Sequence, residues 1–326
     1  MRKFLLATLP LLAAPLCTPV HAAAGDSGPL VVVVNRAAQQ IGIFKVDGQS
    51  LAPLRTLPAG DTPREVCLSA DGKRAYVSNQ KGKSVTVVDL QKLEVAATIT
   101  HDSLDGPDGC VSSADSSKLY VVATKRNAVV AISTRDNKVV KEIALPLAEP
   151  RRLALSPDGS KIFVAADKTP KIAVIDAAKG ALATTFDVGN EPRGMAFTPD
   201  GKTLLVTQVV DDTITAVDLG TYKVTGVRGS PLSPQRLAMS PDGSFAYVLT
   251  RMQPELFALP LKGPHDDSRT LELGKLPWGL AMNPAGTLLY VTGSENNNIQ
   301  IVDTKSFKVV ANVPAGKDPN GIAYRP

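Results

Sequence analysis

Seven prolines recur at an almost constant spacing, and this period constrains the fold more than any other feature of the sequence. Successive prolines lie 42 to 44 residues apart. The stretch 150–159, which reads Pro-Arg-Arg-Leu-Ala-Leu-Ser-Pro-Asp-Gly, recurs in similar form at 192–201 and 234–243. A fixed period of this length is the signature of a repeat architecture. The seven prolines are Pro63, Pro107, Pro150, Pro192, Pro234, Pro277 and Pro319.

Each repeat contains four short runs with the character of β-strands. The run that follows the proline ends at an Asp-Gly turn, and the next run carries a pair such as Tyr76-Val77. A third, alternating run such as 85–89 ends in Asp, and a fourth resembles 139–145. Short strands at this spacing are typical of propeller blades. We therefore expect an all-β fold, a seven-bladed β-propeller of four-stranded antiparallel blades.

The two ends of the chain complete one repeat between them. Pro319 opens a last inner run, 320–325, and the chain stops before the Asp-Gly turn of the other repeats. When Asn35 is aligned with Asn79, Ser27 and Gly28 fall at the position of the turn at 71–72. We expect the N- and C-termini to share one blade, because such closure pairs the last strand and protects the sheet edges.

The first residues have the pattern of an export signal. A basic start at Arg2 and Lys3 precedes an apolar stretch, 4–20, and a small-x-small site ends at Ala22. The stretch is shorter than the roughly 20 residues that a transmembrane helix needs. We expect residues 1–22 to be a signal peptide and residues 23–326 to be a single propeller domain, periplasmic or secreted. Loss of Arg2 and Lys3 lowers the formal charge from +5 to +3.

Two cysteines remain after the expected cleavage, Cys67 and Cys110. They fall on the inner strands of neighbouring blades, four residues after Pro63 and three residues after Pro107. Because side chains alternate along a strand, the two sulfurs point to opposite faces of equivalent sheets, and such faces meet between blades. We predict a disulfide in that seam, as an oxidising compartment allows. The alternative is a pair of buried free thiols.

The recurring motifs resemble a known family. Tyr76-Val77-Ser78-Asn79, with repeated Ser-Pro-Asp-Gly and Val-x-Val-x-Asp elements, is similar to the YVTN-repeat family of seven-bladed propellers. The likeness covers essentially the whole chain after the signal segment. It implies an exported bacterial protein, and relatives of similar architecture include lactonases, lyases and parts of periplasmic redox enzymes. The motif is specific for the fold and says little about activity.

The supply of residues for metal or cofactor chemistry is small. Only His101 and His265 remain after the signal segment, and no Cys-x-x-Cys-His motif or zinc-ligand spacing is present. The sequence contains no Gly-rich phosphate loop or nucleophile elbow. We expect no cofactor and no metal site, and we interpret the cluster 265–267 as a solvated hairpin.

Positively charged residues recur just after the repeat prolines. In a propeller these positions meet at the mouth of the central channel, where guanidinium groups suit carboxylates or phosphates and an indole suits stacking. The sequence therefore predicts an anion-binding mouth. The alternative is that these charges are solvated or pair with nearby carboxylates. The residues concerned are Arg64, Asp108, Arg151, Arg152, Arg193, Gln235, Arg236, Trp278 and Asn320.

This inventory favours a non-enzymatic binding or scaffold protein that recognises an anionic small molecule or a partner protein as a monomer. Nucleic acid is a weaker candidate, because Trp278 is the only tryptophan available to stack on bases. One alternative is a lactonase- or lyase-like enzyme that uses arginine with a lone carboxylate such as Asp108. Another is an accessory subunit of a periplasmic redox system.

Overall fold

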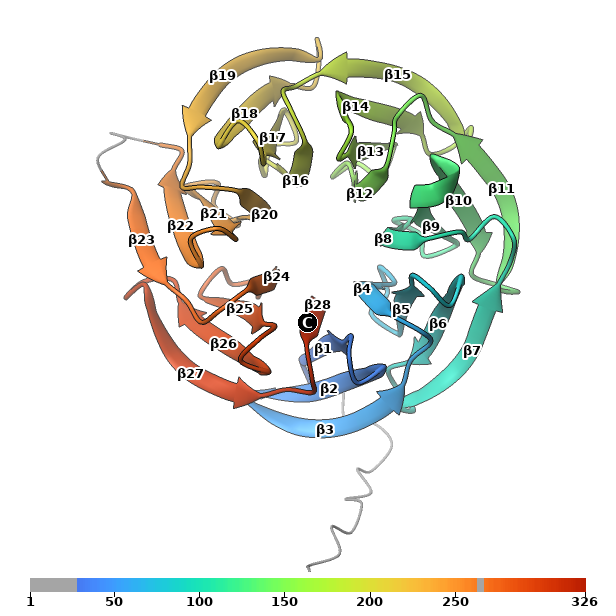
Figure 1. The fold of residues 1–326 in the computed structure, drawn as a ribbon, viewed down its shortest axis with the longest axis horizontal. Helices are drawn as coiled ribbons and strands as arrows, with labels where there is room; N and C mark the ends of the chain where they lie inside the picture. Colours follow the sequence, from blue (N-terminus) through green and yellow to red (C-terminus); the bar gives the residue numbers. More distant parts are fainter. Residues whose placement is uncertain (1–27, 263–266) are drawn as a thin grey trace, which may run out of the picture.

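Seven four-stranded antiparallel sheets stand around a central channel (Figure 1). The computed structural model describes residues 28–262 and 267–326. The expected signal peptide and the residues His265 and Asp266 lie outside the described residues. The predicted fold class is confirmed: each sheet is one blade, and its strands run in order from the channel to the rim.

We number the blades 1 to 7 in ring order and give the strands of each blade from the channel outward. Blade 1 comprises β28 (Pro319–Arg325), β1 (Leu30–Asn35), β2 (Gln40–Asp47) and β3 (Ser50–Pro58). Blade 2 comprises β4 (Pro63–Leu68), β5 (Arg74–Asn79), β6 (Ser84–Asp89) and β7 (Glu94–Thr100). Blade 3 comprises β8 (Pro107–Ser112), β9 (Lys118–Ala123), β10 (Ala128–Ser133) and β11 (Lys138–Ala144), with the 3-10 helix η1 (Thr124–Arg126) after β9.

The remaining four blades follow the same plan. Blade 4 comprises β12 (Pro150–Leu155), β13 (Lys161–Ala166), β14 (Thr169–Asp176) and β15 (Ala181–Asp187). Blade 5 comprises β16 (Pro192–Phe197), β17 (Thr203–Gln208), β18 (Thr213–Asp218) and β19 (Lys223–Gly229). Blade 6 comprises β20 (Pro234–Met239), β21 (Phe245–Thr250), β22 (Glu255–Pro260) and β23 (Arg269–Glu272). Blade 7 comprises β24 (Pro277–Met282), β25 (Leu288–Gly293), β26 (Asn298–Asp303) and β27 (Lys308–Pro314).

The ring is closed by backbone pairing between the two ends of the described chain. Strand β28 pairs antiparallel with β1, with Val32 opposite Ala323 and Leu30 opposite Arg325. The predicted sharing of blade 1 by both termini is therefore confirmed (Figure 1). This closure joins the first and last repeats through main-chain hydrogen bonds.

The apolar core lies between blades, in seven separate clusters. Between blades 1 and 2, Val66 packs with Ala323, and between blades 6 and 7, Leu280 packs with Ala238. Each inner strand thus offers a large side chain to one neighbour and a small one to the other. Because every blade is covered on both faces, the second strands such as β9 are almost entirely buried.

The predicted disulfide occupies one of these seams. Cys67 on β4 is bonded to Cys110 on β8, with the two Cα atoms 5.8 Å apart. Both cysteines belong to the cluster between blades 2 and 3. Cys110 stands at the large position and Cys67 at the small position, so the bond replaces the packing contact of the other seams. It links two strands that also carry side chains into the channel.

The mouth of the channel is built by the same backbone geometry in all seven blades. The residue before each repeat proline has a positive φ, and its carbonyl accepts a hydrogen bond from the residue that follows the second strand. Asp167 N donates to Glu149 O at 3.0 Å in this way, and Val209 N donates to Glu191 O at 3.1 Å. The seven positive-φ residues are Thr62, Gly106, Glu149, Glu191, Ser233, Leu276 and Asp318.

A β-bulge follows each repeat proline. In blade 2 the register between β4 and β5 shifts between Pro63 and Val66, and blade 4 shifts between Pro150 and Arg152. A bulge inserts an extra residue and re-aims the side chains beside it. This explains how two consecutive residues, Arg151 and Arg152, can both donate hydrogen bonds to Asp108 at the start of β8.

Helical structure is nearly absent from the described residues. Over 28–262 and 267–326, no helix has the length and apolar character that crossing a membrane requires.

The disulfide predicts a stability effect. Replacement of both cysteines, Cys67→Ser with Cys110→Ser, should lower the free energy of unfolding by about 2–4 kcal/mol. The reason is that the disulfide joins residues 43 positions apart and so restricts the unfolded chain. Urea denaturation followed by circular dichroism measures the loss. The control is Cys67→Ala with Cys110→Leu, which introduces the small and large apolar pair found in the other seams. This variant should recover part of the lost free energy of unfolding. Equal stability of the double-serine variant and the wild type would contradict this account.

Candidate functional site

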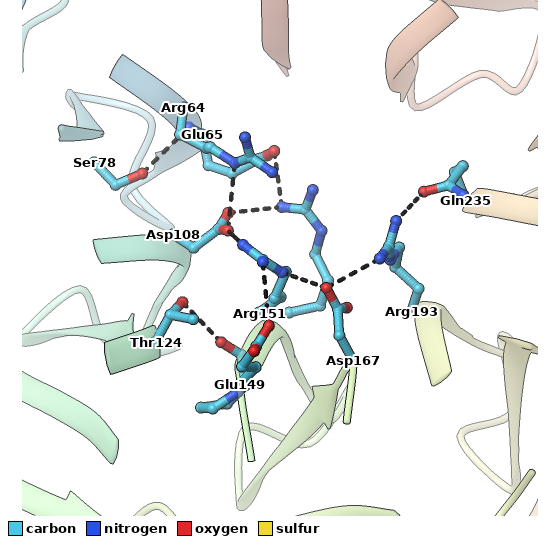
Figure 2. Close-up of polar contacts among 12 residues, drawn as sticks. Arg64, Glu65, Ser78, Asp108, Thr124, Glu149, Arg151, Asp167, Arg193 and Gln235 are labelled. Carbon is cyan, nitrogen blue, oxygen red and sulfur yellow. Dashed lines mark hydrogen bonds and ion pairs between the residues drawn. The ribbon is translucent and has the colours of Figure 1, made fainter. Parts of the chain in front are cut away.

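A completely buried carboxylate, Asp108 at the start of β8, is surrounded by three guanidinium groups. Its oxygens lie 3.3 Å from Arg64 Nε, 3.3 Å from Arg151 Nη1 and 3.4 Å from Arg152 Nη1 (Figure 2). A buried charge is tolerated when such partners compensate for its lost hydration. Asp108 has no solvent-exposed surface, and its charged partners are these three arginines.

A second group of charges bridges the channel itself. Glu65 Oε1 lies 2.7 Å from Arg152 Nη1 and also accepts a hydrogen bond from Arg236 Nη2. These three residues come from blades 2, 4 and 6. Burial opposes ionisation of Glu65, but the charges of Arg152 and Arg236 outweigh it and lower its pKa to about 2. Burial, with the nearby charge of Arg152, lowers the pKa of Arg236 to about 10.

Acidic side chains also join Arg151 and Arg193 across neighbouring blades. Asp167 Oδ2 accepts a hydrogen bond from Arg151 Nε and lies 3.0 Å from Arg193 Nη2. Glu149 lies 3.6 Å from Arg151 Nη2, and Glu191 lies 2.6 Å from Arg193 Nη2. Burial disfavours the charge on Arg151, but the carboxylates of Asp167 and Asp108 together outweigh this effect and raise the pKa of Arg151. The network therefore fixes both guanidinium groups in place.

The only tryptophan is stacked with two arginines. The guanidinium carbons of Arg64 and Arg251 each lie 5.0 Å from the centre of the Trp278 ring. Arg64 thus contacts both Trp278 and Asp108, and it links opposite sides of the channel. The sequence offered Trp278 as a surface for ligand stacking, whereas the structure places it against two side chains of its own chain.

The last two predicted residues lie in different surroundings. Gln235 accepts a hydrogen bond from Arg193 and so belongs to the charged network. Asn320 is buried on β28, where its main-chain carbonyl accepts a 2.7 Å hydrogen bond from the hydroxyl of Thr292. Its side-chain oxygen accepts no hydrogen bond from the described residues, so Asn320 stands apart from the charged network.

The positive charges predicted for the mouth are therefore paired. Each of the five arginines contacts at least one carboxylate, so the observed arrangement is the alternative to an open anion-binding ring. Only one of the acids involved, Asp108, was predicted. A repeated Glu-Pro-Arg at 149–151 and 191–193 is a sequence signal for two of the others. The five carboxylates are Glu65, Asp108, Glu149, Asp167 and Glu191.

A pocket of about 600 Å³ opens beside this network. Glu149 and Arg151 form one wall, and the loops after β5, before β8 and after β9 form the others. The Glu149 side chain is 48% exposed, against 25% for the matching Glu191. Among the described residues, no cluster of His, Cys, Asp and Glu could hold a metal ion. The remaining lining residues are Gln80, Lys81, Gly106, Thr124, Lys125 and Asn127.

Comparisons with known proteins agree with this fold. The family model described as lactonase, 7-bladed beta-propeller, matches residues 22–112. No curated protein matches the sequence.

Solved structures with the same fold share little sequence with this chain. A protein assigned as a 6-phosphogluconolactonase from Bacteroides fragilis is 16% identical with a TM-score of 0.77, over 93% of this chain and 99% of that one. A protein of unknown function from Desulfotomaculum acetoxidans is 20% identical with a TM-score of 0.79, over 90% and 98%. Hydrazine synthase of Kuenenia stuttgartiensis is 22% identical with a TM-score of 0.72, over 80% and 89%.

The preference for a non-enzymatic binding protein is wrong. The family match is to lactonase propellers, and the similar structures include one assigned as a 6-phosphogluconolactonase. The charge distribution in the structure also differs from the one on which that preference was based. It treated the arginines as an open positive surface with one lone carboxylate, whereas the mouth contains several acidic side chains, one of them beside a pocket.

The charge triad across the channel predicts a pH-dependent contribution to stability. Glu65→Gln should lower the free energy of unfolding by about 3–5 kcal/mol near neutral pH, because it removes the carboxylate that pairs with the buried Arg236 and leaves the buried Arg152 with Asp108 alone. The pKa of Glu65 is lowered from 4.5 to about 2. The stabilising effect is therefore complete above about pH 4.5 and is lost as the pH falls toward 2. Urea denaturation of the wild type and of Glu65→Gln, at pH values from about 2 to neutral, measures the difference in their free energies of unfolding.

A matched control is Glu94→Gln, which removes an exposed carboxylate from β7. It should change the free energy of unfolding by less than about 0.5 kcal/mol. Two results would argue against this explanation. One is a Glu65→Gln protein as stable as the wild type, and the other is a difference in the free energy of unfolding that stays constant down to about pH 2. Either would show that the ion pairs of Glu65 with Arg152 and Arg236 do not stabilise the fold.

Proposed function

We propose that this protein is a lactonase-like propeller enzyme that hydrolyses a lactone in the pocket beside Glu149 and Arg151. The family match and the resemblance to a structure assigned as a 6-phosphogluconolactonase support the reaction class. The observation that carries the assignment to this site is the pocket itself, which places a half-exposed carboxylate next to a fixed guanidinium. Its volume of about 600 Å³ suits a small-molecule substrate.

The chemistry requires a base and a group that stabilises negative charge. Hydrolysis of a lactone begins when water attacks the ester carbonyl carbon and the carbonyl oxygen becomes negative. Glu149 accepts the proton of the attacking water, and Arg151 stabilises the oxyanion. The ring carbon–oxygen bond then breaks, and the proton passes to the departing alkoxide. The product is a hydroxy acid.

The surrounding residues prepare Arg151 for this role. Asp108 and Asp167 hold two different nitrogens of its guanidinium, so little reorganisation is needed when charge develops on the substrate. Lys81 and Lys125 add positive charge to the pocket wall. Asp108 is thus a positioning residue in this scheme, and Glu149 replaces it as the carboxylate that acts on the substrate.

We propose further that the protein is an exported member of the YVTN-repeat type. In this scheme residues 1–22 are removed as a signal peptide, and residues 23–326 act as one monomeric propeller domain outside the cytoplasm. The disulfide between Cys67 and Cys110 supports this part, because such bonds persist in oxidising compartments.

Removal of the base gives the principal test. Glu149→Gln should lower kcat for a hydrolysed lactone by about 10²–10⁴-fold with little change in KM, because the amide cannot accept the proton. Release of acid from a panel of γ- and δ-lactones, followed in a pH-stat with the spontaneous rate subtracted, measures the activity. Thermal unfolding of both proteins verifies that the variant is folded.

Glu191→Gln is the matched control. Glu191 occupies the same position of a Glu-Pro-Arg motif one blade further on, but it does not line this pocket. The control should keep most of the activity. Equal losses in the two variants would remove Glu149 from the reaction, and a wild-type protein that hydrolyses no lactone of the panel would overturn the proposed function.

A further inference from the structure

A second pocket lies far out in the ring, between blades 5 and 6. It has a volume of about 320 Å³. Its lining residues come from β17, β18, β19 and β22 and from the turns beside them. None lies on an inner strand, so the pocket is separate from the channel mouth and from the proposed lactonase site.

The pocket exists because the outer strand of blade 5 departs from the repeat. The residue of β19 opposite Ile214 is Arg228, whereas all six other blades have an apolar side chain at this position, buried in five of them. No residue of β19 is buried. The apolar cluster between blades 5 and 6 is also the smallest of the seven. The equivalents of Arg228 are Leu57, Ile99, Ile143, Phe186 and Val313, which are buried, and Leu271 of blade 6, which is partly buried.

A glycine beside Arg228 keeps the pocket open. Gly226 lines the pocket, and a Cβ atom built on it would meet no other atom within 4 Å. The equivalent residue in blade 2 is Ala97, which packs into the cluster between blades 2 and 3. Compared with blade 2, the outer strand of blade 5 therefore lacks two apolar side chains that fill the seam.

The walls and the rim differ in chemistry. The buried part of the lining is apolar and includes Leu205, Ile214 and Leu259. The lining also includes the threonines Thr198, Thr203 and Thr225. Arg228 lines the rim and donates a hydrogen bond to the carbonyl of Pro260 at 3.0 Å. An apolar interior with one guanidinium at the rim complements a molecule that has an apolar body and a negative head group.

We propose that this seam is a binding site for a small aliphatic monocarboxylate. The hydrocarbon chain occupies the space between Leu205, Ile214 and Leu259, and the carboxylate lies at Arg228. The site is independent of the channel chemistry, and it requires no activity of the protein.

The experiment uses sodium butyrate, hexanoate and octanoate as probes of the wild-type protein. Isothermal titration calorimetry should show one site whose affinity rises about fourfold for each added CH₂ group, as expected when each is buried in an apolar pocket. Methyl groups of Ile214, Leu205 and Leu259 should shift in ¹³C-resolved NMR spectra on addition of octanoate. This measurement needs no variant.

Two variants and a control locate the site. Gly226→Leu fills the pocket and should weaken octanoate binding by at least about tenfold. Arg228→Gln should weaken binding of octanoate more than binding of the neutral octanol. Gly229→Leu is the control, because Gly229 lies on the same strand with open space around it and does not line the pocket. It should leave binding unchanged.

Several outcomes would overturn the proposal. One is a wild-type protein with no chain-length dependence and no methyl shifts. Another is octanoate binding that Gly226→Leu leaves intact, which would place the ligand elsewhere. A Gly226→Leu protein with a higher melting temperature, combined with no octanoate binding by the wild type, would identify the space as a packing gap only.

Discussion

A four-stranded blade has two apolar faces and can bury neither of them alone, and the rest of the structure depends on this constraint. Each face is covered only by a neighbouring blade, so the apolar core is divided into seven seams. A linear array would leave its first and last faces in water. The pairing of β28 with β1 removes those ends, and every seam then contributes to one closed structure.

Closure of the ring also creates the channel, where polar rather than apolar side chains have to be buried. Seven inner strands bring polar side chains together, several of them buried, and isolated buried charges would be strongly unfavourable. The chain resolves this with alternating arginines and carboxylates, from Glu65 with Arg236 to Asp167 with Arg193. Such networks add little net stability compared with apolar packing. They do hold guanidinium groups in fixed positions, which is what a site that stabilises developing charge requires.

The sequence could predict whatever the repeat itself encodes. The blade number, the shared blade and the bond between Cys67 and Cys110 follow from the period and from strand alternation. The charge network does not, because a repeat gives a residue's position along its strand but not its reach across the ring. Glu65 meets Arg236, 171 residues away, only because blades 2 and 6 face the same channel. Apart from Asp108, the acidic residues of the charge network were therefore not predicted from the sequence, although its arginines were.

Departures from the repeat are more informative about function than the repeat. Glu149 and Glu191 occupy the same position of the same motif, and both have a positive φ. They differ in what the neighbouring blade offers: the loop after β9 forms the helix η1 and helps to line the pocket beside Glu149. The same reasoning applies to the outer strand of blade 5, where Arg228 and Gly226 stand in place of core residues. In a closed ring of similar units, a pocket forms where one unit differs from the others and its neighbour does not fill the space.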